Sequence, residues 1–221
     1  MSVLNDEEIR NYCEKYRMIE PFDDERVQPA SYDLSVGDEY RLSHEKRIIK
    51  LGKWKKKIKI PPYTICYVLI KEKLNIPADV SAQIFPRHEL VKRGLLIYPQ
   101  PPIDPGFKGK LYVLIHNLTN EIRTINKDEH LVSLVFYKLS DKSEKPYAGK
   151  YQNKETLKEL GLDSKNVDVY SSALKEVSEK IKTWREALFS KYIPILLILM
   201  TIFLMILTIL LTILFGGGVS N

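Results

Sequence analysis

The 221-residue chain has few of the residues that build disulfide frameworks or metal sites. It contains two cysteines, Cys13 and Cys66, and four histidines. Two cysteines are too few for a disulfide framework, and neither belongs to the Cys-x-x-Cys spacing of a structural zinc site. The histidines also lack metal-ligand spacing. We therefore expect two buried thiols and no metal site made by protein side chains.

The C-terminal part lacks charge altogether. The 24 residues from Tyr192 to Phe215 contain no Asp, Glu, Lys, Arg or His. As a helix they would extend roughly 36 Å, which is long enough to cross the hydrocarbon core of a bilayer. A buried helix of a soluble protein is rarely this long, and a signal peptide would lie at the other end of the chain. The sequence therefore predicts one transmembrane helix.

Basic residues flank only one end of this stretch. Lys180, Lys182, Arg185 and Lys191 precede it, whereas residues 216–221 carry no charged side chain. Cytoplasmic flanks of membrane helices are enriched in Lys and Arg. We expect a single-pass membrane protein with its N-terminal domain in the cytoplasm and a short non-cytoplasmic tail.

The remaining charge gives little information about partners. The formal net charge is +6, and the basic run from Lys46 to Lys59 alternates with Ile, Leu and Trp. Such a run is more often a solvated strand face than a patch for nucleic acid or lipid headgroups. No nucleic-acid partner is expected.

Hydrophobic periodicity predicts one short helix followed mainly by strands. Asn5 is a good N-cap for a helix over Asp6 to Tyr16. Short segments rich in β-branched and aromatic residues, separated by Pro, Gly, Asn and Asp, indicate an antiparallel barrel or jelly roll. These segments are Thr64 to Ile70, Ser81 to Phe85, Lys110 to His116 and Leu131 to Tyr137.

A second helix is predicted before the membrane span. From Val167 to Phe189 the sequence has helical periodicity, with one apolar stripe and charges opposite. This neck could pack on its own domain or associate with other copies into a helical stalk. The stripe consists of Val169, Leu174, Val177, Ile181, Trp184 and Leu188.

Four segments of the globular part carry ordered motifs: Ile19 to Ser43 (IEPFDDERVQPASYDLSVGDEYRLS), Ile76 to Leu96, Ile103 to Asn117 (IDPGFKGKLYVLIHN) and Pro146 to Lys154 (PYAGKYQNK). Together they closely resemble dCTP deaminases, members of the trimeric dUTPase superfamily. The resemblance implies a distorted jelly roll that assembles as a homotrimer with nucleotide sites at subunit interfaces. The predicted organisation is a dUTPase-like domain over 1–155, a helical neck over 156–191, a membrane helix over 192–215 and a tail over 216–221.

The family's catalytic residue is missing. Deamination without zinc needs a carboxylate near C4 of the base, and the family's glutamate aligns with Leu114. The His-x-Glu and Pro-Cys-x-x-Cys signature of the zinc deaminases is absent too. Leucine cannot transfer a proton, so the resemblance predicts a site that cannot carry out the family reaction.

Other departures surround the same site. The family's Arg-Ser-Ser-Leu-Ala-Arg becomes the segment from Arg87 to Lys92, which lacks both phosphate-binding hydroxyls. The base-reading hairpin, residues 98–102, loses its usual His-x-Thr-Ala character. Ser133 and Lys154 stand where the superfamily has glutamines.

Several family positions remain, and the resemblance implies nucleotide binding by Asp33, Arg87, Lys92, Asp104, Lys150 and Tyr151. Asp104 matches the aspartate that positions the attacking water in the dUTPase branch, so it would be catalytic only in an active enzyme. Glu89 is the weak candidate to replace the missing glutamate. Mg²⁺ could accompany a bound triphosphate. Each residue also has a structural interpretation: Arg87, for example, could pair with Glu89 or another carboxylate.

Three functions stay open at this stage. The first is a membrane-anchored, catalytically inactive homotrimer that binds a nucleotide or nucleotide-like ligand and couples binding to its membrane helices, as a sensor or effector with an extension to cellular defence. The second is an active membrane-bound dCTP deaminase or dUTP diphosphatase. The third is a trimeric scaffold that recruits a protein partner.

Overall fold

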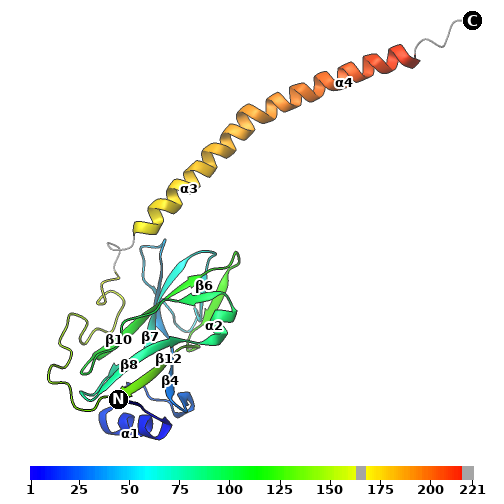
Figure 1. Ribbon diagram of the computed structural model, residues 1–221. Helices are drawn as coiled ribbons and strands as arrows, with labels where there is room; N and C mark the ends of the chain where they lie inside the picture. Colours follow the sequence, from blue (N-terminus) through cyan, green and yellow to red (C-terminus); the bar gives the residue numbers. More distant parts are fainter. Residues whose placement is uncertain (163–167, 216–221) are drawn as a thin grey trace, which may run out of the picture. The chain divides into compact units, whose positions relative to one another are not determined.

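The computed structural model describes residues 1–162 and 168–215, which belong to two compact units, Met1–Asp168 and Val169–Asn221. The first unit is mainly β (Figure 1). Its elements are β1 (Ser2–Val3), α1 (Asp6–Tyr16), β2 (Ile19–Glu20), the 3-10 turn η1 (Asp24–Arg26), β3 (Val27–Gln28), β4 (Ser31–Leu42), β5 (Ile49–Lys50), β6 (Lys57–Ile60), β7 (Ile65–Asn75), β8 (Val80–Pro86), α2 (His88–Lys92), β9 (Leu95–Ile97), β10 (Lys108–Asn117), β11 (Arg123–Asn126) and β12 (His130–Lys138).

Helix α1 has the predicted bounds, and its N-terminus explains why. The Asn5 side chain accepts a hydrogen bond from the Glu8 amide at 2.8 Å, and the Glu8 carboxylate accepts one from the Asn5 amide at 3.0 Å. This capping box satisfies two amides that the helix itself leaves without partners. Ile9 and Cys13, four residues apart, are buried on the face that packs against the sheet.

The strands form an antiparallel, curled sheet in the order β1-β12-β4-β7-β10-β9, and β11 and β6 form a second small sheet. β8 pairs with β12, β2 with β7, and β3 and β5 with β4. Three of the four predicted strand segments lie within β8, β10 and β12, and the fourth overlaps β7 but begins one residue early, at Thr64. Each observed strand is longer than predicted. The expected mainly β, jelly-roll-like class is confirmed.

Strand β4 joins the two halves of the curled sheet. Its first residues pair with β12 and its last residues with β7, with a register shift between Val36 and Tyr40. Gly37 lies at this shift, where an added Cβ would be 2.7 Å from the main-chain oxygen of Leu69. A side chain at this position would push β7 away, so glycine permits the close approach of the two strands.

A second, smaller hydrophobic cluster lies outside the main core. Leu157, Leu160 and Leu162 pack with Ile65, Tyr67 and Leu69 of β7. Two buried charged residues of β4 hold this segment: the Leu157 amide donates to Glu39 Oε2 at 2.9 Å, and Arg41 Nη1 donates to the Leu162 main-chain oxygen at 2.7 Å. Residues 157–162 are therefore fastened to the outer face of β7 and β4.

The second unit consists of α3 (Asp168–Ala187), a π-helical turn η2 (Leu188–Tyr192) and α4 (Ile193–Phe215). The predicted neck helix is present, although Val167 lies outside the described residues. Four side chains of its apolar stripe, Val177, Ile181, Trp184 and Leu188, are exposed in the single chain.

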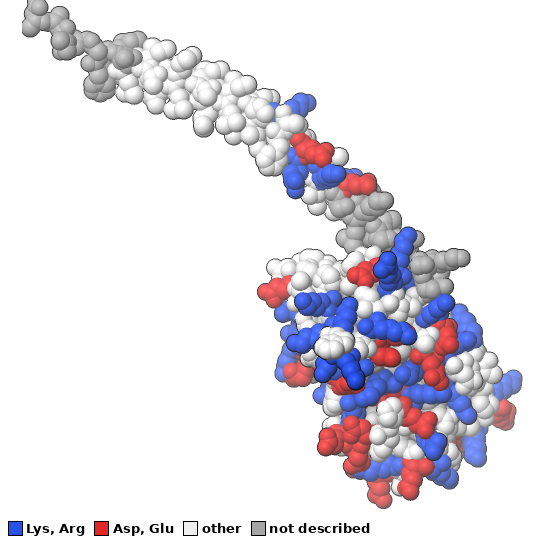
Figure 2. All heavy atoms as spheres, turned by 180° about the vertical axis from the view of Figure 1, so that it is seen from behind, with Lys and Arg blue, Asp and Glu red and all other residues white. Residues whose placement is uncertain are grey.

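One helical segment, Glu179–Leu211, is long and apolar enough to cross a membrane: an 18-residue stretch within it has a mean hydropathy of 3.0 and no buried residues. Charged side chains are confined to the part before α4 (Figure 2). The predicted apolar helix is therefore present, and length and composition are the features that qualify it as a span.

Candidate functional site

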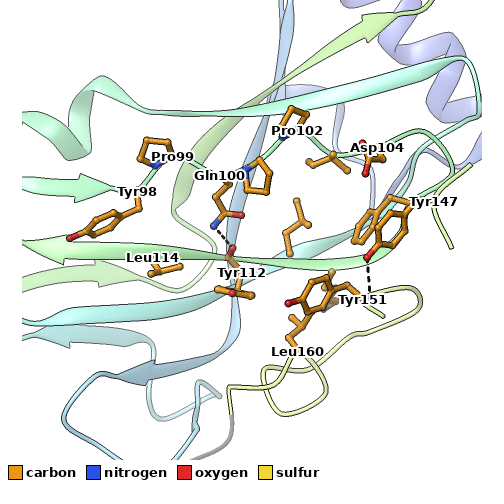
Figure 3. Close-up of a pocket in the computed structure, with 15 residues that line it drawn as sticks. Tyr98, Pro99, Gln100, Pro102, Asp104, Tyr112, Leu114, Tyr147, Tyr151 and Leu160 are labelled. Carbon is orange, nitrogen blue, oxygen red and sulfur yellow. Dashed lines mark hydrogen bonds between the residues drawn. The ribbon is translucent and has the colours of Figure 1, made fainter. Parts of the chain in front are cut away.

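The globular unit contains a cavity of about 580 Å³ between the segment 98–104 and strand β10. Figure 3 shows its walls: the proline-rich hairpin on one side, β10 at the base, and the loops that carry Tyr147, Tyr151 and Leu160 on the other. The lining residues are Tyr98, Pro99, Gln100, Pro101, Pro102, Ile103, Asp104, Phe107, Lys110, Leu111, Tyr112, Leu114, Tyr147, Tyr151 and Leu160.

A tight turn places Asp104 at the rim. The Phe107 amide donates to the Asp104 main-chain oxygen at 3.2 Å, and Gly106 has φ +85°. Pro105 and Gly106 suit the two central positions of such a turn, because proline presets the first φ and glycine accepts a positive second φ. The exposed Asp104 carboxylate has no hydrogen-bond partner among the described side chains. It is therefore free to accept hydrogen bonds from a ligand.

The hairpin is held by amide side chains. Gln83 Nε2 of β8 donates to the Gln100 main-chain oxygen at 2.9 Å, and Gln100 Nε2 donates to the Tyr112 main-chain oxygen at 2.7 Å. The second of these bonds is the dashed line near the centre of Figure 3. These bonds fix the hairpin to both neighbouring strands, so the cavity is shaped before any ligand arrives.

Aromatic rings form much of the wall. Tyr147 packs edge-on against Phe107 with ring centroids 5.7 Å apart, and its hydroxyl accepts a hydrogen bond from the Tyr151 amide at 3.3 Å. Burial raises the pKa of Tyr112, so its hydroxyl stays protonated at neutral pH. Such walls suit a flat ring that stacks on aromatic faces and accepts or donates a few hydrogen bonds.

Leu114 lies in this cavity, on β10 (Figure 3). Among the lining residues, Asp104 is the one carboxylate and Lys110 the one ammonium group. The position that the resemblance assigns to the catalytic glutamate is therefore in the cavity, but it is occupied by a side chain that cannot exchange protons. The cavity has aromatic walls, and it lacks a carboxylate at that point to activate water.

Asp33 and Arg87 meet elsewhere. Arg87 donates to Asp33 Oδ2, Ser133 Oγ donates to Asp33 Oδ1 at 2.8 Å, and His130 Nδ1 lies 3.4 Å from Oδ2. Asp33 is 1% exposed, so its charge is compensated by these partners rather than by water. Of the two structural interpretations of Arg87, pairing with Glu89 or with another carboxylate, the second is the one observed, and the carboxylate is that of Asp33. None of the four lines the cavity of its own chain.

The other predicted site residues also divide between positions at the cavity and positions away from it. Lys92 and Glu89 form an exposed pair on α2 at 3.2 Å. Tyr151 lines the cavity, and Lys150 lies over the Tyr151 ring, 4.9 Å from its centroid, in a hollow that shares Tyr112 and Leu114 with the cavity. The fold therefore brings Asp104, Lys150 and Tyr151 to one site and Asp33 and Arg87 to another.

Several lining residues were not predicted as site residues, among them Tyr112, Tyr147 and Leu160. Tyr112 and Leu114 are two apart on β10 and so share one face of the strand, a signal that the sequence contained. Tyr147 begins the motif YAGKY, whose end, Tyr151, was predicted. Leu160 belongs to no motif, and only the folded chain places it at the cavity.

The described residues contain no group of three or more His, Cys, Asp or Glu side chains placed to hold a metal ion. Asp33 already has three protein partners. Phosphate oxygens and water are the usual partners of Mg²⁺ at nucleotides. The residues present fit a metal that arrives with a triphosphate better than one held by the protein alone.

Comparisons with known proteins agree on one family. The family model described as dCTP deaminase-like matches residues 3–139. The dCTP deaminase of Pyrococcus horikoshii is 36% identical over 140 residues, which cover 63% of this chain and 87% of that protein. The dCTP deaminase of Thermococcus kodakarensis is 35% identical over 140 residues and 88% of its length is matched.

A solved structure supports the fold. The 2'-deoxycytidine 5'-triphosphate deaminase of Agrobacterium tumefaciens superposes with a TM-score of 0.52 and 20% sequence identity. The match covers 61% of this chain and 48% of that chain, about half of its length. At this identity the likeness concerns the fold alone. Residues 140–221, which include α3 and α4, lie beyond the matched family model.

Proposed function

Since the chain belongs to the dCTP deaminase-like family, we propose that it binds a nucleotide or nucleotide-like ligand in the cavity beside β10 without deaminating it. In this proposal the protein is a membrane-anchored homotrimer, and ligand binding is passed to the membrane helices. It acts as a sensor or effector rather than as an enzyme of nucleotide metabolism.

The observation that carries the proposal is Leu114 in the wall of the cavity beside β10, at the position of the family's catalytic glutamate. Three features favour binding of a ring with a polar group attached. They are the aromatic walls, the hairpin fixed by Gln83 and Gln100, and the Asp104 carboxylate, which has no hydrogen-bond partner among the described side chains. The missing proton-transfer group disfavours hydrolytic deamination, because water must lose a proton to something as it attacks C4.

Assembly as a trimer is supported by the division of the retained residues. Arg87 and Asp33 do not line the cavity of their own chain. Gln83 contacts the hairpin and precedes Arg87 by four residues of extended chain. The main chain at Arg87 is therefore roughly 13 Å from the main chain at Gln83, and so is displaced from the hairpin. A site that combines the cavity of one copy with the basic side chains Arg87 and Lys92 of another would use both groups. Mg²⁺ would accompany a triphosphate there.

Coupling to the membrane is supported by Leu160. This residue lines the cavity and belongs to the small cluster made by residues 157–162. The segment is the last part of the globular unit before α3 in the chain. Residues 157–162 are either packed on β4 and β7 or released from them. A ligand that contacts Leu160 shifts this equilibrium if it binds one of the two arrangements more tightly than the other.

The anchor rests on the apolar helix within Glu179–Leu211. Lys180, Lys182, Arg185 and Lys191 precede α4, so we propose a cytoplasmic globular unit followed by a neck, a span over 192–215 and a short tail. This single pass would bring three helices together in a trimer.

The test uses the full chain in lipid nanodiscs with dCTP, dUTP and the other common nucleotides plus Mg²⁺. Ammonia, pyrophosphate and melting temperature are followed in the same samples. A ligand that binds only the folded state raises the melting temperature in proportion to the logarithm of its concentration over Kd. The expected result is stabilisation by one nucleotide class without product.

Two results contradict the proposal. Release of ammonia or pyrophosphate over many turnovers would make the chain an anchored enzyme despite Leu114. No stabilisation by any nucleotide would leave the recruiting scaffold as the better explanation.

A further inference from the structure

The loop between β5 and β6 presents a tryptophan at the centre of a cluster of lysines. Trp54 is 99% exposed. The Gly52 amide donates to the Lys55 main-chain oxygen at 3.0 Å, which closes a tight turn around residues 53 and 54. At the base, Leu51 is buried and its amide donates to the Asp38 main-chain oxygen at 2.6 Å. The indole is thus held outward by an anchored turn.

The lysines of this loop are exposed and lack carboxylate partners. Lys53, Lys55, Lys56, Lys57 and Lys59 are all exposed, and none forms an ion pair among the described residues. Lys55 Nζ lies over the ring of Tyr40, 5.4 Å from its centroid. Glu45 is the one carboxylate in the groove that these lysines line.

Strand β6 accounts for only part of this pattern. Ile58 and Ile60 are buried while Lys57 and Lys59 face outward, as expected of a solvated strand face. Trp54 is not on the strand. Placing a large apolar ring entirely in water has no structural purpose within the single chain.

The loop lies at the end of the domain where the chain leaves for its apolar helix. Tyr40 and Leu42 of β4 line the lysine groove, and Arg41 between them binds the Leu162 main-chain oxygen. Glu39 connects the same two parts, because Lys50 Nζ lies 3.6 Å from its carboxylate and the Leu157 amide donates to it. The basic loop and the exit of the chain therefore lie at the same end of β4, on its two opposite faces.

We propose that residues 51–59 form a second membrane contact, which docks on anionic lipid headgroups of the bilayer that α4 crosses. The lysines bind the headgroup phosphates and the Trp54 ring enters the interfacial region. This inference rests on the proposed anchor.

The energetics suit a tethered domain. A lysine near an anionic leaflet contributes about 1 kcal/mol, and tryptophan favours the interface between water and hydrocarbon. A few such contacts bind weakly when the protein is free in solution. A domain joined to the membrane by the residues between Leu162 and Ile193 samples the surface at high effective concentration, so weak contacts suffice.

Nucleic acid and free polyphosphate also carry phosphate groups that these lysines could bind, so they are the alternatives to lipid headgroups. The exposed indole at the tip, the position beside the chain exit and the apolar helix favour lipid. Single-stranded nucleic acid would need several aromatic rings along a groove, and Trp54 is the one fully exposed ring of this loop.

The experiment uses the full chain with Trp184→Phe, which leaves Trp54 as the single tryptophan, because the sequence contains two. The protein is placed in nanodiscs whose scaffold protein lacks tryptophan. Their lipid is phosphatidylcholine, with or without phosphatidylglycerol, and its acyl chains carry bromine atoms that quench nearby indoles. The expected result is a blue-shifted, quenched emission in the anionic discs that reverses in high salt. We expect this blue shift and quenching to be lost in the triple variant Lys55→Gln/Lys56→Gln/Lys57→Gln. The control is Lys15→Gln/Lys142→Gln/Lys145→Gln, which removes the same charge elsewhere and is expected to retain both effects.

The outcomes separate the two proposals. A chain that does not remain in the discs contradicts the anchor. A chain that remains in anionic discs with a solvent-exposed, unquenched Trp54 contradicts the loop contact alone. Emission that responds to a single-stranded oligonucleotide or to polyphosphate but not to anionic lipid would also overturn it, in favour of a nucleic-acid or free phosphate site.

Discussion

Arg41 donates from Nη1 to the main-chain oxygen of Leu162 at 2.7 Å, which joins two residues 121 positions apart in the sequence. Arg41 is 2% exposed, and its guanidinium also lies over the Tyr67 ring, 5.8 Å from the centroid. Leu162, the last described residue before α3, is therefore held by a buried charge. The segment 157–162 cannot leave β4 without removing a partner of that charge.

Arg41→Met is expected to release this segment. The substitution leaves the Leu162 oxygen without its donor, at a cost of about 1–3 kcal/mol. Amide hydrogen exchange in residues 156–162 should become faster, while exchange in β12 stays slow. The control is Arg17→Met, which removes an exposed arginine from a 3.6 Å pair with Glu20. Unchanged exchange in 156–162 would show that the leucines and Glu39 hold the segment without Arg41.

Asp104→Ala is expected to abolish nucleotide binding and leave the fold intact. The carboxylate is exposed and has no side-chain partner among the described residues, so the free energy of unfolding should change by less than about 0.5 kcal/mol. The measurement is the ligand-induced shift in melting temperature. Asp141→Ala, another exposed aspartate that does not line the cavity, is the matched control. Unchanged binding would remove Asp104 from the proposed site.

Stability is expected to fall below pH 6.5 because of His130. Burial, together with the charges of Arg26 and Arg87, lowers the pKa of His130 below its usual value. Between the two pKa values the unfolded chain binds more protons than the folded chain, so unfolding becomes easier as the pH falls through this window. The Asp33 carboxylate lies 3.4 Å from Nδ1 of His130, and the charges of Asp23 and Glu72 oppose the lowering of the pKa without reversing it.

The measurement is the urea midpoint of the wild type and His130→Gln from pH 7.5 to 5. The difference between the two proteins should level off well above pH 6.5, where the histidine is mostly neutral in both states. Below it, the wild type should lose stability faster than the glutamine variant. Parallel curves would show that His130 does not contribute to the acid response.

Local signals in the sequence predicted the regular elements well. Helix α1 followed from Asn5 and the spacing of Ile9 and Cys13, which depend on residues within one or two turns. The four predicted strands followed from short segments of β-branched and aromatic residues between turn residues. The alternation in the basic run indicated a solvated strand face, and Ile58 and Ile60 are indeed buried between exposed lysines. Such patterns depend on the chain's neighbours in sequence and are therefore readable before folding.

The partners of charged groups were harder to predict. Asp33 and Arg87 are 54 positions apart, and their pairing depends on β4, β12 and β8 lying side by side. The contribution of Leu160 to the cavity depends on how residues 157–162 pack against β7. Long-range packing of this kind leaves no periodic signal, so motif resemblance located Asp104 and Tyr151 but could not locate Leu160.

The apolar helix gives the last prediction, which concerns the anchor. Leu204→Arg places a charge near the middle of α4 and is expected to reduce membrane integration, because a central arginine costs about 2.5–3.5 kcal/mol on the insertion scale. Leu204→Ala is the matched control, since it shortens the same side chain without adding charge. The measurement is the fraction of protein that stays with membranes after alkaline carbonate extraction. If α4 instead packed as a soluble helix against a protein partner, carbonate would release the wild type and both variants alike, and the anchor would have to be abandoned.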